Sequence, residues 1–158
     1  MAEGAKELKL TTRLIDALYT EAMLLADEAR AYFDERGAQD RETLAPAMQV
    51  AFSCEALKAT TRLMQVLAWL LNRRATEVGE LTADAPSGTL GEAPESDADL
   101  VATLPPVARE MIEATIDLYE RARRIDRGIG PQVPPDSPAH GLFHRLERSF
   151  RAGEPQQP

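Results

Sequence analysis

Residues 51–74 read AFSCEALKATTRLMQVLAWLLNRR, and the apolar spacing of this stretch decides the fold. Its apolar residues recur every three or four positions, which is the spacing of one face of a helix. No run in it alternates apolar and polar residues with the period of two that a strand would show. The pattern predicts a helix from Asp40, as N-cap, to about Val78, before Gly79. Two apolar stripes follow that helix. The first, the heptad stripe, repeats every seven residues and consists of Ala47, Val50, Cys54, Leu57, Thr61, Met64, Ala68, Leu71, Ala75 and Val78. The second stripe lies on another side of the helix and consists of Phe52, Ala56, Leu63, Val66 and Leu70. We therefore expect the helix to be buried by two neighbours.

Two more helical patterns flank this one. The first covers about residues 11–36 and should stop at Gly37, and the last follows Pro105 and Pro106 and continues to about Arg127. On the first helix we expect the core seam to consist of Leu14, Leu18, Ala22, Leu25, Ala29 and Tyr32. On the last helix we expect it to consist of Ala108, Met111, Thr115, Leu118, Ala122 and Ile125. The sequence thus predicts an all-α protein in which residues 1–127 form a three-helix bundle of long antiparallel helices.

Two segments fall outside the predicted helices. Residues 80–99 hold six acidic residues, no Lys or Arg, and several prolines and glycines, which predicts a mobile acidic loop. Residues 128–158 begin with a Pro-rich linker and end in a short amphipathic tail that we expect to be disordered unless it binds a surface. The apolar face of the tail consists of Leu142, Phe143, Leu146 and Phe150.

Charge and composition exclude several classes of partner. The chain has 158 residues and a formal net charge of −8, which disfavours nucleic acid and anionic membrane surfaces. Its strongest apolar run is far shorter than the roughly 20 residues of a membrane span, and its N-terminus lacks the pattern of a secretory signal. We expect a cytoplasmic protein. Cys54 is the only cysteine and should behave as a small hydrophobe.

The sequence contains no complete motif for catalysis or metal binding. A di-iron bundle needs Glu-x-x-His on inward helix positions, whereas His140 and His144 both lie in the tail. No phosphate-binding glycine loop, nucleophile elbow or zinc pattern is complete. We expect no catalytic residue, no metal and no cofactor, and hence a function in binding other proteins.

Two surfaces are candidates for that binding. Carboxylates line one side of the first helix at Glu21, Asp27, Glu28, Asp34 and Glu35. They form either a solvated face that aids solubility or a docking ridge. The apolar face of the tail suits a helix-in-groove partner, or it folds back on the bundle.

The lengths of the helices predict a homodimer. The middle helix would span about 57 Å and the first only about 39 Å, so the end of the middle helix should overhang. The apolar residues of the overhang would then need a second copy to cover them, the interface being formed by Leu63, Val66, Trp69 and Leu70.

Three long segments resemble one known family. Residues 51–74, quoted above, residues 14–35 (LIDALYTEAMLLADEARAYFDE) and residues 104–126 (LPPVAREMIEATIDLYERARRID) are similar to the regulator of CtrA degradation family, RcdA, which is also catalogued as a domain of unknown function. The resemblance implies a dimeric three-helix bundle that serves as an adaptor for the ClpXP protease. It also implies that a response regulator primes the ClpX unfoldase and that the adaptor then tethers substrate proteins to it. The alternatives are a structural or small-molecule-binding helical bundle, and an enzyme subunit or transcription-factor-like module.

Overall fold

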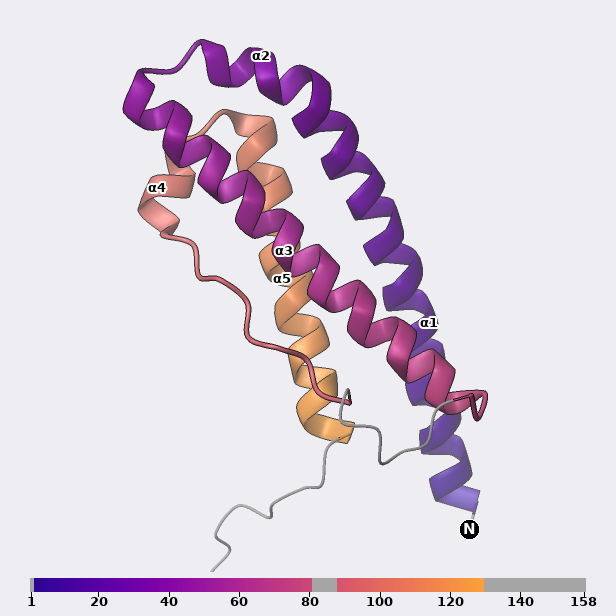
Figure 1. Cartoon of the computed structure of the whole chain (residues 1–158). Helices are drawn as coiled ribbons and strands as arrows, with labels where there is room; N and C mark the ends of the chain where they lie inside the picture. The colour runs from indigo at the N-terminus through magenta and orange to yellow at the C-terminus, as the bar shows by residue number, and fades with distance from the viewer. Residues whose placement is uncertain (1, 81–87, 130–158) are drawn as a thin grey trace, which may run out of the picture. The chain divides into compact units, whose positions relative to one another are not determined.

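The computed structural model describes residues 2–80 and 88–129 and confirms the predicted all-α bundle (Figure 1). Its three long helices are α1 (Ala2–Ala31), α3 (Pro46–Glu77) and α5 (Pro106–Ile129). Shorter helices are α2 (Gly37–Glu42) and α4 (Ala98–Ala102). Residues 128–158 separate as a second unit, and the tail with Leu142, Phe143, Leu146 and Phe150 lies outside the described residues.

The long helices are not all antiparallel to one another. Thr12 near the start of α1 donates to Glu77 at the end of α3 (Oγ1 to Oε1, 3.3 Å), so these two helices run in opposite directions. By contrast, α3 and α5 run in the same direction, because Arg62 reaches Thr115 and Trp69, further along α3, reaches Asp126. The chain must therefore return along the length of the bundle between α3 and α5 (Figure 1).

Gly37 does not end the first helix, contrary to the sequence-based prediction. The helix continues through a π-helical turn, η1 (Tyr32–Arg36), into α2, and Gly37 itself has a helical φ of −62°. A Cβ at this position would lie 2.9 Å from the Tyr32 carbonyl oxygen and 3.2 Å from its ring. The glycine therefore permits close packing in the π turn and supplies no left-handed cap.

The ends of α3 agree with the sequence only in part. Asp40 is not its N-cap, because Asp40 belongs to α2 and accepts a hydrogen bond from the Tyr32 hydroxyl (2.8 Å). The helix instead begins at Pro46, whose fixed φ suits the first helical turn. Gly79 has a φ of +76° and ends the helix in the left-handed conformation, as predicted.

The core follows the predicted seams with small shifts. On α1 and η1, Leu18, Ala22, Ala29 and Tyr32 are buried as predicted, but Ile15 is fully buried in place of Leu14, which is half exposed. On α5, Ile112 is buried where Met111 was expected, and Ala108, Thr115, Leu118 and Ala122 are buried as predicted.

The largest correction concerns the two stripes of α3. The second stripe is in the core, but the heptad stripe faces solvent, so α3 is not buried on two sides. The residues predicted to form the dimer interface are buried in the monomer: Leu63, Val66, Trp69 and Leu70 are all at most 5% exposed. That prediction was wrong, because the first helix begins at Ala2, well before the predicted start, and its Thr12 already reaches Glu77 at the end of α3, so no overhang remains. Cys54, on the heptad stripe, is exposed.

The close approach at Gly37 can be tested with a matched pair of glycine substitutions. Gly37→Ala should destabilise the fold by about 1–3 kcal/mol, because its Cβ must displace the Tyr32 backbone. Gly4→Ala adds a methyl group within α1, where nothing lies within 4 Å, and should stabilise by up to about 1 kcal/mol through helix propensity. Denaturant unfolding measures both. Equal effects from the two substitutions would contradict the account of the π turn.

Candidate protein-binding surfaces and the strap across the bundle

The carboxylates predicted to line one side of the first helix as an acidic ridge are exposed. Asp27, Glu28, Asp34 and Glu35 are exposed on α1 and η1, and the only ion pair shown there among the described residues joins Arg30 Nε to Asp34 Oδ2 at 3.7 Å. An ion pair so exposed contributes little to stability. We keep the name acidic ridge for these four carboxylates.

Glu21 has a different role from the rest of the ridge. The Arg121 guanidinium on α5 binds both oxygens of its carboxylate, with Nη1 to Oε2 at 2.8 Å, and Nε of Arg121 also donates to Asp117. The hydrogen bond from Arg121 lowers the pKa of Glu21 below its ordinary value, and the pKa of Arg121 is raised in turn. Glu21 therefore holds α1 to α5 and is not a free docking group.

An extended segment, residues 88–97, crosses the bundle beside α3 and α5, and we call it the strap (Figure 1). Arg73 donates to the Gly88 carbonyl at 2.7 Å, and Gln65 donates to the Glu92 carbonyl at 2.7 Å. Tyr119 donates its hydroxyl to the Gly91 carbonyl and accepts from the Ala93 amide. The Leu90 amide donates to Asp126. This part of the predicted mobile loop is thus held by side chains from two helices; residues 81–87 lie outside the described residues.

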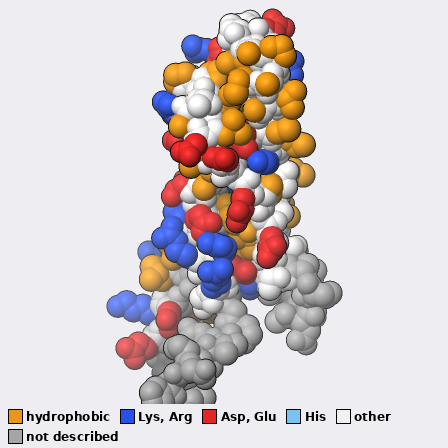
Figure 2. Space-filling view, turned by 90° about the vertical axis from the view of Figure 1, so that its left-hand side faces the viewer, with side chains coloured by type: hydrophobic (Ala, Val, Ile, Leu, Met, Phe, Trp, Pro, Cys, Tyr) orange, Lys and Arg blue, Asp and Glu red, His pale blue; other side chains and the backbone are white. Residues whose placement is uncertain are grey.

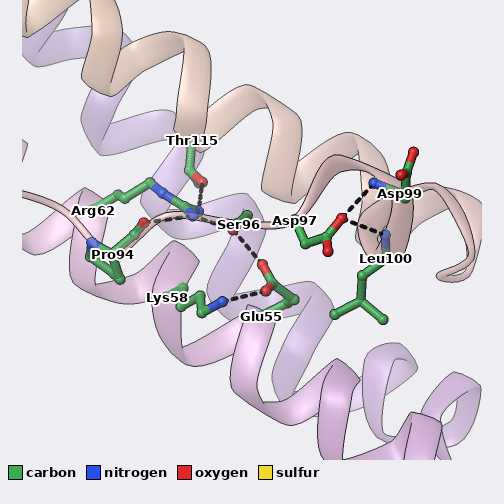
Figure 3. Close-up of polar contacts among 9 residues, drawn as sticks. All are labelled: Glu55, Lys58, Arg62, Pro94, Ser96, Asp97, Asp99, Leu100 and Thr115. Atoms are coloured by element: carbon green, nitrogen blue, oxygen red, sulfur yellow. Dashed lines mark hydrogen bonds and ion pairs between the residues drawn. The ribbon is translucent and has the colours of Figure 1, made fainter.

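The strap ends on a polar cluster, drawn in Figure 3, in which the half-buried Ser96 joins the buried Glu55 and Arg62. Arg62 donates to Ser96 and to the Pro94 carbonyl at 3.0 Å, and the Ser96 hydroxyl donates to Glu55. Lys58 donates to the other Glu55 oxygen at 2.7 Å. Burial lowers the pKa of Arg62, and the nearby Glu55 charge opposes that effect. Glu55 is fully buried and Arg62 is 2% exposed, so each charge depends on its partners within the cluster.

This cluster was missed in the sequence. Glu55 and Arg62 are seven residues apart, which places both on the same side of a helix, and that side is the buried one. Their spacing was a usable signal, but Ser96 is 34 residues from Arg62 and nothing local relates the two. The cluster fixes the strap and offers no free group for chemistry.

An open cavity of about 510 Å³ lies between the strap and α5 and bears on the small-molecule alternative. Its lining includes Arg62, Tyr119 and Arg123 together with the acidic residues Glu92, Glu95 and Glu120. The Arg62 guanidinium and the Tyr119 hydroxyl already bond the strap, so these groups serve the fold. The cavity therefore gives no support to a dedicated ligand site.

The described part of the chain shows neither a cluster of metal ligands nor a membrane-spanning helix. Within residues 2–80 and 88–129, no three His, Cys, Asp or Glu side chains converge as metal ligands. No helix within those ranges is both long and apolar enough to cross a membrane. His140 and His144 lie outside them.

The heptad stripe of α3 is the main exposed apolar feature. Its large members are between 51% and 72% exposed: Val50, Leu57, Met64, Leu71 and Val78. Figure 2 shows that hydrophobic side chains gather on the upper part of the face drawn there, while charged side chains crowd its lower part. Contiguous exposed apolar surface on a folded domain usually marks an interaction site.

The fold is that of an all-α bundle of three long helices, which exposes an acidic ridge and an apolar stripe in its described part. The chain belongs to the family described as "Protein of unknown function (DUF1465)", whose model matches residues 6–150. It is also similar to the crystal structure of RcdA from Caulobacter crescentus CB15, with 32% sequence identity and a TM-score of 0.67. That match covers 78% of this chain and 97% of RcdA, and confirms the resemblance inferred from the sequence. No curated protein matches this sequence.

Removing one charge from the buried cluster should be costly. Arg62→Met leaves the buried Glu55 carboxylate with Lys58 and Ser96 alone, and should lower the free energy of unfolding by about 3–5 kcal/mol. The double variant Glu55→Leu, Arg62→Met removes both charges and should recover much of that loss. Chemical unfolding of both variants decides the matter. A single variant as stable as the unmodified protein would show that the cluster does not hold the strap.

The ion pair between Glu21 and Arg121 predicts a pH dependence. Because the folded-state pKa of Glu21 is lowered, its contribution to stability is present above the unfolded pKa, near 4.5, and is lost as pH falls through the folded value. Unfolding curves at several pH values should therefore show Glu21→Gln less stable than the unmodified protein at pH 7, with the gap closing in acid. Glu28→Gln, on the ridge, is the control and should show a much smaller gap. An undiminished gap for Glu21→Gln at the acid limit would contradict this assignment.

Proposed function

We propose that this protein is a non-enzymatic adaptor that tethers substrate proteins to a primed ClpXP protease for regulated proteolysis in cell-cycle control. The observation that carries the proposal is the match to RcdA, which extends over 97% of the RcdA chain at 32% identity. An adaptor needs a rigid body with exposed surfaces that hold its partners at high effective concentration. The bundle provides the rigid body.

The partners in this proposal are the ClpX unfoldase, a priming response regulator and the substrate proteins. We place the protein in the cytoplasm, where these partners act, and expect it to be a homodimer. The acidic ridge of Asp27, Glu28, Asp34 and Glu35 is the proposed docking surface for a basic partner, because its charges are exposed and have little role in holding helices together. The apolar residues of the tail remain a second proposed contact: Leu142, Phe143, Leu146 and Phe150.

Reconstituted proteolysis tests both the function and the ridge. ClpX, ClpP, the response regulator and a candidate substrate are combined with the full chain, and substrate loss is followed over time. The unmodified protein should accelerate degradation only when the response regulator is present. A variant with Asp27, Glu28, Asp34 and Glu35 changed to Lys should lose on the order of tenfold in partner affinity at low ionic strength, with nearly unchanged thermal melting.

The matched control reverses four carboxylates elsewhere on the surface, Glu3, Glu7, Glu110 and Glu113, all exposed. Both variants change the net charge equally, so a loss confined to the ridge variant identifies a docking surface and not a general charge effect. If the full chain accelerates no degradation and does not bind the primed unfoldase, the adaptor proposal fails. If degradation is accelerated equally by the ridge variant, the ridge is a solvated face.

A further inference from the structure

The heptad stripe of α3 lies opposite the core over the whole length of that helix. It holds no charged residue, and it consists of Ala47, Val50, Cys54, Leu57, Thr61, Met64, Ala68, Leu71, Ala75 and Val78. Positions spaced alternately by three and four form the seam of a coiled coil, which needs a facing helix. No segment among the described residues covers the large members of this seam.

Size alternates strictly along the seam. One of the two heptad positions holds only small residues, which are Ala47, Cys54, Thr61, Ala68 and Ala75. The other holds only large apolar residues, which are Val50, Leu57, Met64, Leu71 and Val78. Helices pack closely when large side chains face small ones across the interface. The sequence of the seam is therefore informative about how a second helix would lie.

We infer that α3 packs against α3 of a second copy of this chain, antiparallel and about a two-fold axis between Thr61 and Met64. With full overlap this register pairs Ala47 with Val78, Cys54 with Leu71, and Thr61 with Met64, and the two-fold repeats each pair in reverse. Every layer then contains one small and one large residue. A parallel pair would instead stack small on small and large on large, leaving gaps and crowding in alternate layers.

The polar groups near the seam fit this arrangement. Thr61 sits at the two-fold axis, where its hydroxyl already donates to the Leu57 carbonyl at 2.9 Å and needs no partner across the interface. Lys58 and Arg74, which flank the seam, are engaged within their own chain, with Glu55 and with Asp16. In the antiparallel register, Lys58 and Arg74 each lie away from the same residue of the second chain, so no like charges meet across the interface.

A shallow hollow gives the register a further point of support. It is largely apolar, and Val50, Cys54 and Leu57 line it together with residues from the start of α3. Leu71 of the second copy falls opposite Cys54, and thus over this hollow. The homodimer is part of the function proposed above; the inference here adds its surface and orientation.

Sedimentation equilibrium of the full chain tests the surface. The unmodified protein at micromolar concentration should have twice its 17.4 kDa chain mass. Leu57→Glu or Met64→Glu places charges in the seam and should give the mass of one chain. Leu24→Glu is the control: Leu24 is 62% exposed on α1, away from the seam, and the variant should remain dimeric. Circular dichroism should show all three variants folded, because each site is exposed.

Oxidative cross-linking tests the orientation. Leu71→Cys should form a disulfide-linked dimer between Cys54 of one chain and the new thiol of the other. The unmodified protein should not cross-link, because its two Cys54 side chains lie far apart in the antiparallel pair. Leu71→Cys combined with Cys54→Ser should also stay uncross-linked.

Other results overturn the inference. A monomeric unmodified protein at these concentrations refutes the dimer, and a dimer that survives both Leu57→Glu and Met64→Glu uses another surface. Cross-linking of the unmodified protein through Cys54 would show a parallel pair. None of these results bears on accelerated proteolysis in the reconstituted assay, so failure of the interface and failure of the adaptor function are told apart.

Discussion

An extended segment on a helical bundle has no neighbouring strand, so side chains must satisfy its backbone amides and carbonyls. Here α3 and α5 run in the same direction, and the chain has to return along the bundle between them. Gln65 and Arg73 of α3, with Tyr119 and Asp126 of α5, bond the strap over most of its course. At the end of the strap, Ser96 links the buried Arg62 guanidinium to the buried Glu55 carboxylate, since it accepts from the first and donates to the second. The parallel arrangement of two long helices rests on these contacts.

The strap also settles which side of α3 faces inward. The face that bonds the strap and packs on α1 and α5 carries Glu55 and Arg62 among its apolar residues, while the uncharged heptad stripe is left outside. Burying that polar face is tolerable because Ser96, Thr115 and the Pro94 carbonyl satisfy the charges. The heptad stripe then remains exposed, and an exposed apolar face promotes aggregation in water unless a partner covers it.

Local sequence patterns predicted much of the fold and little of its contacts. Helical spacing located the three long helices, and Gly79 and Pro106 marked a helix end and a helix start in the expected way. Gly37 misled the prediction because a glycine needed for close packing and a glycine at a helix end look the same in sequence. The acidic ridge was located by its spacing, but the role of Glu21 depends on Arg121, 100 residues away. Contacts of that range, like those of the strap, leave no local pattern.

The choice between the two stripes of α3 could not have been made from hydrophobicity alone. By that measure the heptad stripe is the better core candidate, since it has no charged member, whereas Glu55 and Arg62 interrupt the other side. The monomer nevertheless buries the interrupted side, because only there does the fold provide partners for those charges. A seam whose members are all uncharged gives up no solvated charge when a partner covers it, and so it can serve a contact between separate chains at low desolvation cost. The side that looks most like a core is thus the one suited to an interface.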